Sequence, residues 1–98
     1  MSYDRVFEAL ADPGRRKILK LLRVGSLTAG QIAEVFHLSK PTLSHHFRVL
    51  RAAGLVRMER RGTNVVYTLQ ANALEDIATE ILDLAASPKL KMKKARTS

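Results

Sequence analysis

Apolar residues recur three and four positions apart through most of the first fifty residues, which predicts a series of short amphipathic helices. The first helix is expected over residues 3–10. A second is expected over residues 13–22, because Asp12 is a typical N-cap residue and Pro13 fits the first helical position. The start of the chain is therefore predicted to be helical.

A third helix is expected over residues 28–36, because Thr28 and Gln31 have the spacing of a capping box. A turn near residues 36–38 then leads to a fourth helix. Two consecutive helices joined by so short a turn are typical of a helix-turn-helix.

The fourth helix combines one apolar face with one polar face. Ser39 is a natural N-cap, Pro41 falls in the first turn, and Gly54 suits the end of the helix. The apolar face consists of Leu43, Phe47 and Leu50. The other face presents cations and short hydrogen-bonding side chains, namely Lys40, Ser44, His45, Arg48 and Arg51. Such a surface suits the major groove of DNA, so we interpret this segment as a recognition helix.

Two strand-like runs follow, over residues 55–60 and 64–69, and they are joined through Arg61-Gly62-Thr63. They predict a β-hairpin wing. A last helix is expected over residues 72–86, with an apolar stripe of coiled-coil type that is expected to pack against a second copy of the chain. The predicted dimer interface combines apolar residues of the first and last helices: Val6, Phe7, Leu10, Leu74, Ile77, Ile81 and Leu84.

Together these elements predict a mainly helical α+β domain, a winged helix-turn-helix with four helices, two strands and a final helix in that order. The domain is expected to occupy residues 1–87. Residues 88–98 form a basic tail that is expected to be disordered, because it holds five cations and no acidic residue.

The charge narrows the choice of partner. A net charge of +8 over 98 residues points to a polyanion, either nucleic acid or an anionic membrane surface. Residues 1–87 hold 12 cations and nine acidic residues, a net +3, so the tail supplies much of the excess. No apolar run approaches the roughly 20 residues of a membrane span, and no signal peptide is evident, which predicts a cytoplasmic protein.

Catalytic chemistry is not indicated. The sequence shows no phosphate-cradling glycine-rich loop, no nucleophile elbow and no arguable pair of catalytic carboxylates, so we expect neither an enzyme nor a cofactor. The absence of cysteine excludes thiolate metal sites and dithiol redox chemistry. His45 and His46 are adjacent, so they point about 100° apart and cannot chelate one ion as an i, i+4 pair could. We expect His46 to pack in a partly buried position and His37 to be structural or exposed.

Several motifs, taken in order, resemble those of the ArsR family. They are Ala11-Asp12-Pro13-Gly14-Arg15-Arg16-Lys17-Ile18-Leu19, Ala29-Gly30-Gln31-Ile32-Ala33, Ser39-Lys40-Pro41-Thr42-Leu43-Ser44-His45-His46, Leu50-Arg51-Ala52-Ala53-Gly54-Leu55-Val56 and the Arg61-Gly62 wing. The resemblance covers about residues 3–86. It implies a homodimeric winged-helix repressor that binds an operator. The early Asp-Pro-x-Arg-Arg pattern is similar to a metal-free branch of the family that contains an autorepressor.

The same resemblance makes metal sensing the main rival. Metal-sensing relatives carry cysteines in the third helix, where this chain has residues such as Val35 and Phe36. Zinc-type relatives place aspartate and histidine ligands in the last helix, which here contains no histidine. Its four carboxylates are expected to form a solvated face: Glu75, Asp76, Glu80 and Asp83. The two metal sites of the family are therefore expected to be absent.

The predicted DNA contacts fall into three groups. Near the start of the recognition helix, base edges are expected to be read by Lys40, Thr42, Ser44 and His45, the last of which the resemblance also places on DNA. Phosphates are expected to be bound by Arg48, Arg15 and Arg16. Arg60 and Arg61 are expected to reach the adjacent minor groove or its backbone. A twofold dimer would then read an imperfect palindrome with half-sites roughly 10 base pairs apart.

Three alternatives stay open. The chain could be a metal-responsive repressor of the same family, or a DNA-coating protein without sequence preference. It could also use its winged helix to bind a partner protein. The sequence names no inducer, so release from DNA by a small molecule or a partner protein is also open.

Overall fold

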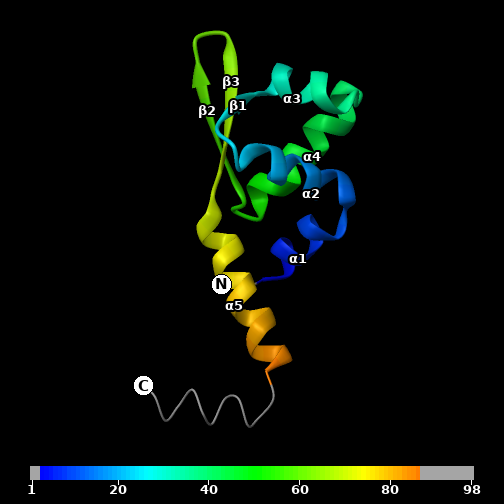
Figure 1. The fold of residues 1–98 in the computed structure, drawn as a ribbon. Helices are drawn as coiled ribbons and strands as arrows, with labels where there is room; N and C mark the ends of the chain where they lie inside the picture. The colour runs from blue at the N-terminus through cyan, green and yellow to red at the C-terminus, as the bar shows by residue number, and fades with distance from the viewer. Residues whose placement is uncertain (1–2, 87–98) are drawn as a thin grey trace.

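The computed structural model describes residues 3–86 and shows a winged helix-turn-helix (Figure 1). The predicted basic tail lies outside the described residues. In chain order the elements are α1 (Asp4–Ala11), α2 (Pro13–Leu22), β1 (Leu27–Thr28), α3 (Ala29–Phe36), α4 (Lys40–Ala52), β2 (Val56–Arg61), β3 (Asn64–Leu69) and α5 (Ala71–Ala85). The predicted fold class is confirmed, and the predicted order lacks only the short strand β1.

The helices of the helix-turn-helix begin where their caps predict. At α3, the Thr28 hydroxyl accepts from the Gln31 backbone N–H at 3.1 Å, and the Gln31 side chain accepts from the Thr28 N–H at 2.9 Å. At α4, the Ser39 hydroxyl accepts from the Thr42 N–H at 3.3 Å. Each bond satisfies a backbone donor that a helix start leaves without a partner.

The alanine side chain of a Thr28→Ala variant could not accept the hydrogen bond from the Gln31 backbone N–H. We therefore expect this substitution to lower the free energy of unfolding by about 1 kcal/mol. Urea unfolding followed by circular dichroism measures this loss. Thr63→Ala, in the exposed hairpin turn, is the matched control and should change it by less than about 0.5 kcal/mol. Equal losses for the two variants would contradict the capping role.

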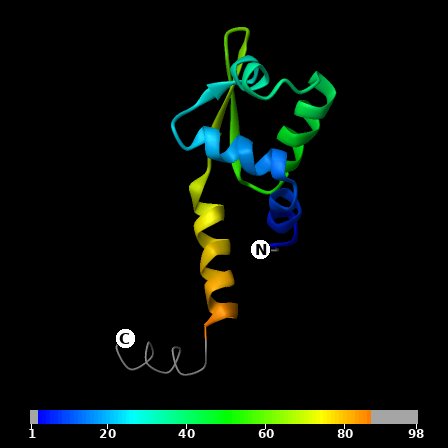
Figure 2. The same ribbon diagram turned by 45° about the vertical axis from the view of Figure 1, so that its right-hand side comes forward.

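The three strands form one antiparallel sheet in the order β1-β3-β2. Tyr67 in the central strand pairs with Leu27 of β1 on one side and with Met58 of β2 on the other. The hydroxyls of Ser26 and Thr68 lie 2.7 Å apart and also tie the segment before β1 to β3. The β2–β3 hairpin projects at one end of the molecule and α5 at the other (Figures 1 and 2).

The hydrophobic core lies between the helices and the sheet. Its largest fully buried side chains are Ile18, Ile32, Leu50 and Leu55. The ring of Phe47 on α4 stacks on Tyr67 of β3, with centroids 3.8 Å apart and planes 10° from parallel. Recognition helix and wing are therefore joined by the core itself. Within residues 3–86, no helix is both long enough and apolar enough to cross a membrane.

Two residues predicted for the dimer interface belong to this core instead. Val6 and Ile77 are buried within a single chain. The structure corrects the prediction for both, because a side chain already covered by its own domain has almost no surface left for a second copy.

Candidate nucleic-acid interface

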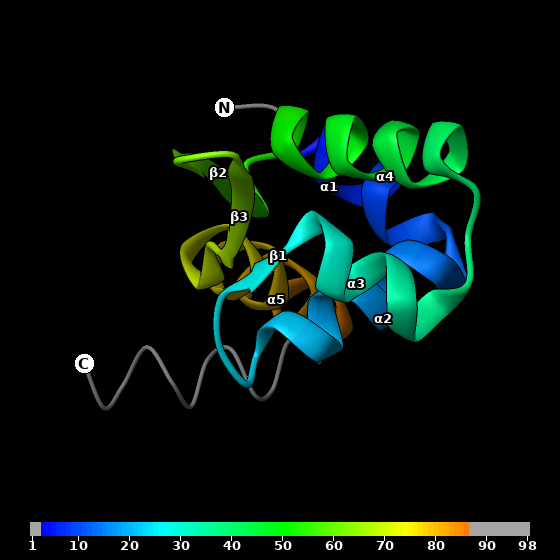
Figure 3. The same cartoon turned by 90° about the horizontal axis from the view of Figure 1, so that it is seen from above.

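Helix α4 runs along one side of the domain, with α2 and α3 on the other side (Figure 3). Its apolar residues face the core, and Leu43, Phe47 and Leu50 are buried. All five of its predicted DNA-contacting side chains are exposed: Lys40, Thr42, Ser44, His45 and Arg48. The hydroxyl of Thr42 also accepts a hydrogen bond from the Ser39 hydroxyl at 2.9 Å. The fold thus presents one polar, cationic helix face to solvent.

His45 and Arg48 border a shallow hollow of about 250 Å³ between α1 and α4. The hollow is also lined by Arg5 and Glu8 of α1 and by Val49 and Ala52 of α4. The sequence does not single out Arg5, because the pattern of residues 3–10 indicates only an apolar helix face and no site for its polar residues. The packing of α1 against α4 places this cation at the same hollow as His45 and Arg48.

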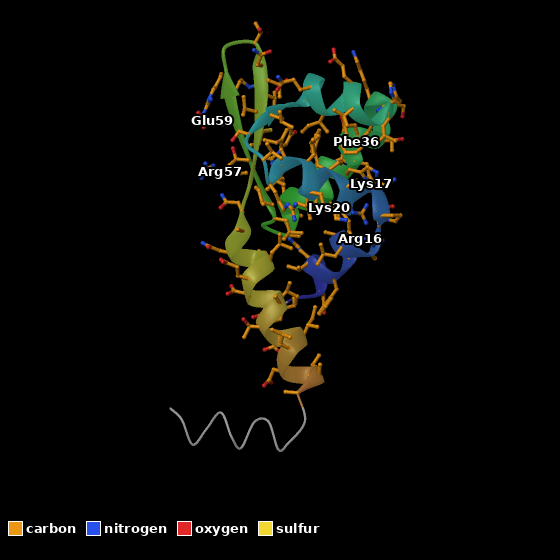
Figure 4. The ribbon with its side chains drawn as sticks, viewed as in Figure 1. Arg16, Lys17, Lys20, Phe36, Arg57 and Glu59 are labelled. Carbon is orange, nitrogen blue, oxygen red and sulfur yellow. The ribbon has the colours of Figure 1, made fainter. Side chains whose placement is uncertain are left out.

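The wing carries exposed charges on β2 (Figure 4). Arg61 donates from Nε to Glu59 Oε1 at 3.1 Å, and this hydrogen bond lowers the pKa of the Glu59 carboxyl. Both side chains are more than half exposed, so the pair contributes little to stability. Arg60 and Arg61 stand beside the hairpin turn, as a wing contact requires.

Arg15 and Arg16 serve the end of α1. The last four carbonyls of a helix lack intrahelical partners, and α1 has no basic residue in its own last turn. Arg15 donates from Nε to the Ala9 carbonyl at 2.8 Å and from Nη2 to the Glu8 carbonyl at 2.9 Å. Arg16 donates from Nη1 to the Leu10 carbonyl at 2.7 Å. Two cations thus cap the negative end of the α1 dipole.

This placement corrects the predicted role of Arg15. Its side chain is only 8% exposed, and its guanidinium is held by protein partners, so it is not placed to bind a phosphate. Arg16 is exposed on α2, near Lys17 and Lys20 in Figure 4, and a phosphate contact by Arg16 stays a prediction.

His46 lies on the inner side of α4, and its prediction as a packing residue is confirmed by its burial. Its Nδ1 lies 3.3 Å from Arg15 Nη1, and its Nε2 lies 3.8 Å from Asp12 Oδ2. Burial lowers the pKa of the imidazole, the charges of Arg15 and His45 lower it further, and the Asp12 carboxylate opposes them. The pKa of Asp12 is lowered chiefly by the hydrogen bond from the Arg15 backbone N–H.

Apolar side chains stand exposed on α1 and α5. Phe7 is 46% exposed, Ile81 45% and Leu84 79%. Leu10 and Leu74 are partly buried against the core. Of the predicted dimer residues, the structure therefore leaves Phe7, Ile81 and Leu84 with the most surface for a partner.

Comparison with known proteins identifies the family to which this chain belongs. Residues 12–58 match the profile of the bacterial regulatory protein, arsR family. The chain is 47% identical over 73 residues to the transcriptional repressor SdpR of Bacillus subtilis, an alignment that covers 74% of this chain and 81% of SdpR. The chain belongs to the ArsR family. As an ArsR-family protein it is a transcriptional regulator and not an enzyme, as the resemblance implied.

Other ArsR-family similarities cover most of the chain. The arsenical resistance operon repressor of Staphylococcus aureus is 39% identical over 80 residues, covering 79% of this chain and 77% of the repressor. Among solved structures, an ArsR-like transcriptional regulator from Rhodococcus sp. RHA1 superimposes with a TM-score of 0.76 at 25% identity, covering 95% of this chain and 88% of the other. HlyU from Vibrio cholerae gives 0.68 at 29% identity, covering 82% and 87%.

Proposed function

We propose that the chain is a cytoplasmic, homodimeric repressor that binds a pseudo-palindromic operator without needing a metal ion, and that its own promoter is a target. The observation that carries this proposal is the exposed face of α4, where hydroxyl, imidazole and cationic side chains stand together on a helix anchored by Phe47 and Leu50. The similarity to SdpR, a transcriptional repressor, supports repression of transcription by this chain.

Sequence reading is assigned to the first half of α4. Lys40 suits guanine edges, and the hydroxyls of Thr42 and Ser44 suit either base. His45 reads beside them, while Arg48 and Arg16 bind phosphates and Arg60 and Arg61 contact the adjacent minor groove. Arg5, at the hollow beside Arg48, is added as a further phosphate contact. Two such surfaces related by a twofold axis would read half-sites roughly 10 base pairs apart.

Metal independence is supported by the lack of suitable ligands. The sequence contains no cysteine, and α5 contains no histidine. Within residues 3–86, no group of three histidine, aspartate or glutamate side chains is arranged to hold an ion. Since one relative is a repressor of an arsenical resistance operon, a metal-responsive function is the alternative to test.

The test is binding of the full chain to its own upstream DNA, to a duplex selected from a random pool, and to a scrambled duplex of equal length. At about 150 mM salt, we expect the selected duplex to bind at least about a hundredfold more tightly than the scrambled one. Zinc or arsenite should leave this ratio unchanged. Equal binding to all duplexes would instead indicate a DNA-coating protein, and a ratio that falls on adding metal would indicate a metal-responsive repressor.

A variant pair assigns the binding to α4. Arg48→Ala should weaken binding to every duplex alike and reduce the slope of log affinity against log salt by about 1. Arg23→Ala, an exposed arginine at the end of α2, is the matched control and should leave both quantities unchanged. Equal losses in the two variants would contradict the assigned DNA face.

A further inference from the structure

A polar cluster lies beneath the recognition helix, on the side away from the proposed DNA face. We define the cluster as Asp12, Arg15 and His46. Arg15 holds the carbonyl end of α1, its backbone belongs to α2, and its guanidinium meets His46 of α4. One side chain therefore links three helices, one of which is the recognition helix.

The hydrogen bonds fix the protonation of His46. An arginine guanidinium offers only donors, so Nδ1 of His46 must accept from Arg15 Nη1. The ring is then neutral with its proton on Nε2, the atom that faces Asp12 Oδ2 at 3.8 Å. A Cβ at Gly14 would come within 3.4 Å of Nε2 and within 2.9 Å of Asp12 Oδ2, so only glycine leaves room for this close approach.

We propose that Arg15 and His46 are positioning residues, which set the orientation of α4 on the operator without touching DNA themselves. This inference rests on the proposed operator binding. His46 is followed along the chain by the core residue Phe47 and preceded by the reader His45, whose ring centroid lies 6.2 Å from its own. A change in how α4 sits on α2 would therefore move its reading side chains together.

Protonation of His46 is expected to release this link. A second ring proton on Nδ1 would point at the Arg15 guanidinium, which can only donate and carries the same charge. The groups that face the ring are Arg15 and Asp12 from the α2 side and His45 from α4 itself. Because burial places the pKa of His46 below its ordinary value near 6.5, the contribution of the neutral ring is complete above about pH 6.5 and is lost as the pH falls through the folded-state value.

The experiment measures the specificity ratio, the affinity for the selected duplex divided by that for the scrambled duplex, at about pH 7.5 and about pH 5.5. For the wild type we expect the ratio to fall severalfold in acid, because the protonated ring can no longer accept from Arg15. His46→Gln can accept from Arg15 and donate toward Asp12 but does not titrate at position 46, so its ratio should fall clearly less in acid than that of the wild type. His37→Asn, at the exposed end of α3 where φ is 52°, is the control and should retain the wild-type fall.

A second variant tests Arg15 at about pH 7.5. Arg15→Lys keeps the charge but replaces three nitrogens, each of which meets a different acceptor, with a single nitrogen at the end of the side chain. We therefore expect its specificity ratio to drop by about tenfold. Arg23→Lys is the matched control and should keep the ratio. A folded Arg15→Lys with the wild-type ratio would overturn the positioning role, and so would identical pH profiles for wild type and His46→Gln.

Nitrogen NMR of the histidine rings tests the inference on the wild-type protein alone, so the test needs neither DNA nor a folded Arg15→Lys variant. At about pH 7.5 the spectrum should show His46 neutral, with its proton on Nε2. A proton on Nδ1 would overturn the inference while leaving the proposed function intact. A wild-type specificity ratio near one at every pH would instead refute the proposed function, and the positioning role with it.

Discussion

Phe47→Ala is expected to lower the free energy of unfolding by about 3–5 kcal/mol, the range for removing a buried phenylalanine. Phe47 is 4% exposed and packs in the centre of the core. Its ring also stacks on Tyr67 at 3.8 Å, an aromatic pair that contributes about 0.5–1.5 kcal/mol beyond buried area. Because small domains have only about 5–15 kcal/mol of net stability, the variant should be largely unfolded at moderate urea concentrations. Urea titration followed by circular dichroism measures the loss.

Phe47→Leu separates the contribution of core burial from that of aromatic stacking, since leucine is a large apolar side chain but has no ring to stack on Tyr67. We expect its loss to be roughly half that of Phe47→Ala. A loss below about 1 kcal/mol for Phe47→Ala would contradict the packing described, since large losses are the mark of a cavity in a core. The Phe47 side chain links the recognition helix to the wing from inside the core. The effect of both variants on DNA binding should therefore follow the fraction of folded protein.

Local signals explain why the helices could be predicted from sequence. Asp12, Thr28 and Ser39 accept from backbone N–H groups three residues later, so the partners of each cap lie within its own segment. The hairpin was also predictable, since β2 and β3 are joined by a two-residue turn and the apolar residues Val65, Tyr67 and Leu69 occupy alternate positions of β3. Confirmed features of this kind need no knowledge of the tertiary fold.

Strand β1 shows the opposite case. It consists of only Leu27 and Thr28, too short for an alternating pattern, and its partners Tyr67 and Val66 lie some forty positions away. The same two residues looked like the approach to a capped helix, and they serve that purpose as well. Only the folded sheet shows that they also pair with β3.

Arg15 shows what could not be predicted from the sequence at the candidate interface. In a basic segment beside a predicted helix-turn-helix, an arginine resembles a phosphate contact, and nothing local separates that role from a structural one. One signal was available, because α1 has no basic residue of its own in its last turn and Arg15 follows within reach. Its contact with His46 spans 31 positions and could not be read from spacing. Likewise, periodicity placed Val6 and Ile77 on apolar faces without showing how deeply each is buried.

Ile81→Glu is expected to convert the proposed dimer to a folded monomer. Ile77 is the one buried residue of α5, a helix of 15 residues, so most of this helix lacks cover from its own domain. An isolated helix of that length is marginal in water, which favours a partner along its apolar stripe. Leu74, Ile81 and Leu84 lie seven and then three positions apart, which is the spacing of a coiled-coil seam. A carboxylate at position 81 would be desolvated in such a seam without a counter-charge.

Sedimentation at tens of micromolar tests the oligomeric state directly. Thr79→Glu adds the same charge at an exposed, polar position of α5 and is the matched control, which should sediment like the wild type. Circular dichroism should show that the domain of Ile81→Glu is folded, because Ile81 is 45% exposed and lies outside the core. A monomeric wild type, or a dimeric Ile81→Glu, would contradict the proposed interface.

The loss of the dimer should have a large effect on operator binding. Two linked reading helices gain about 10²–10⁴ in affinity over one, because the second half-site is bound as an intramolecular step. We therefore expect Ile81→Glu to bind the selected duplex about 10²–10⁴ times more weakly, with little change for a duplex that holds a single half-site. Equal weakening on both duplexes would place the damage in the reading surface of α4 instead of in the pairing of two copies. The single-half-site duplex thus separates dimerisation from recognition in one titration series.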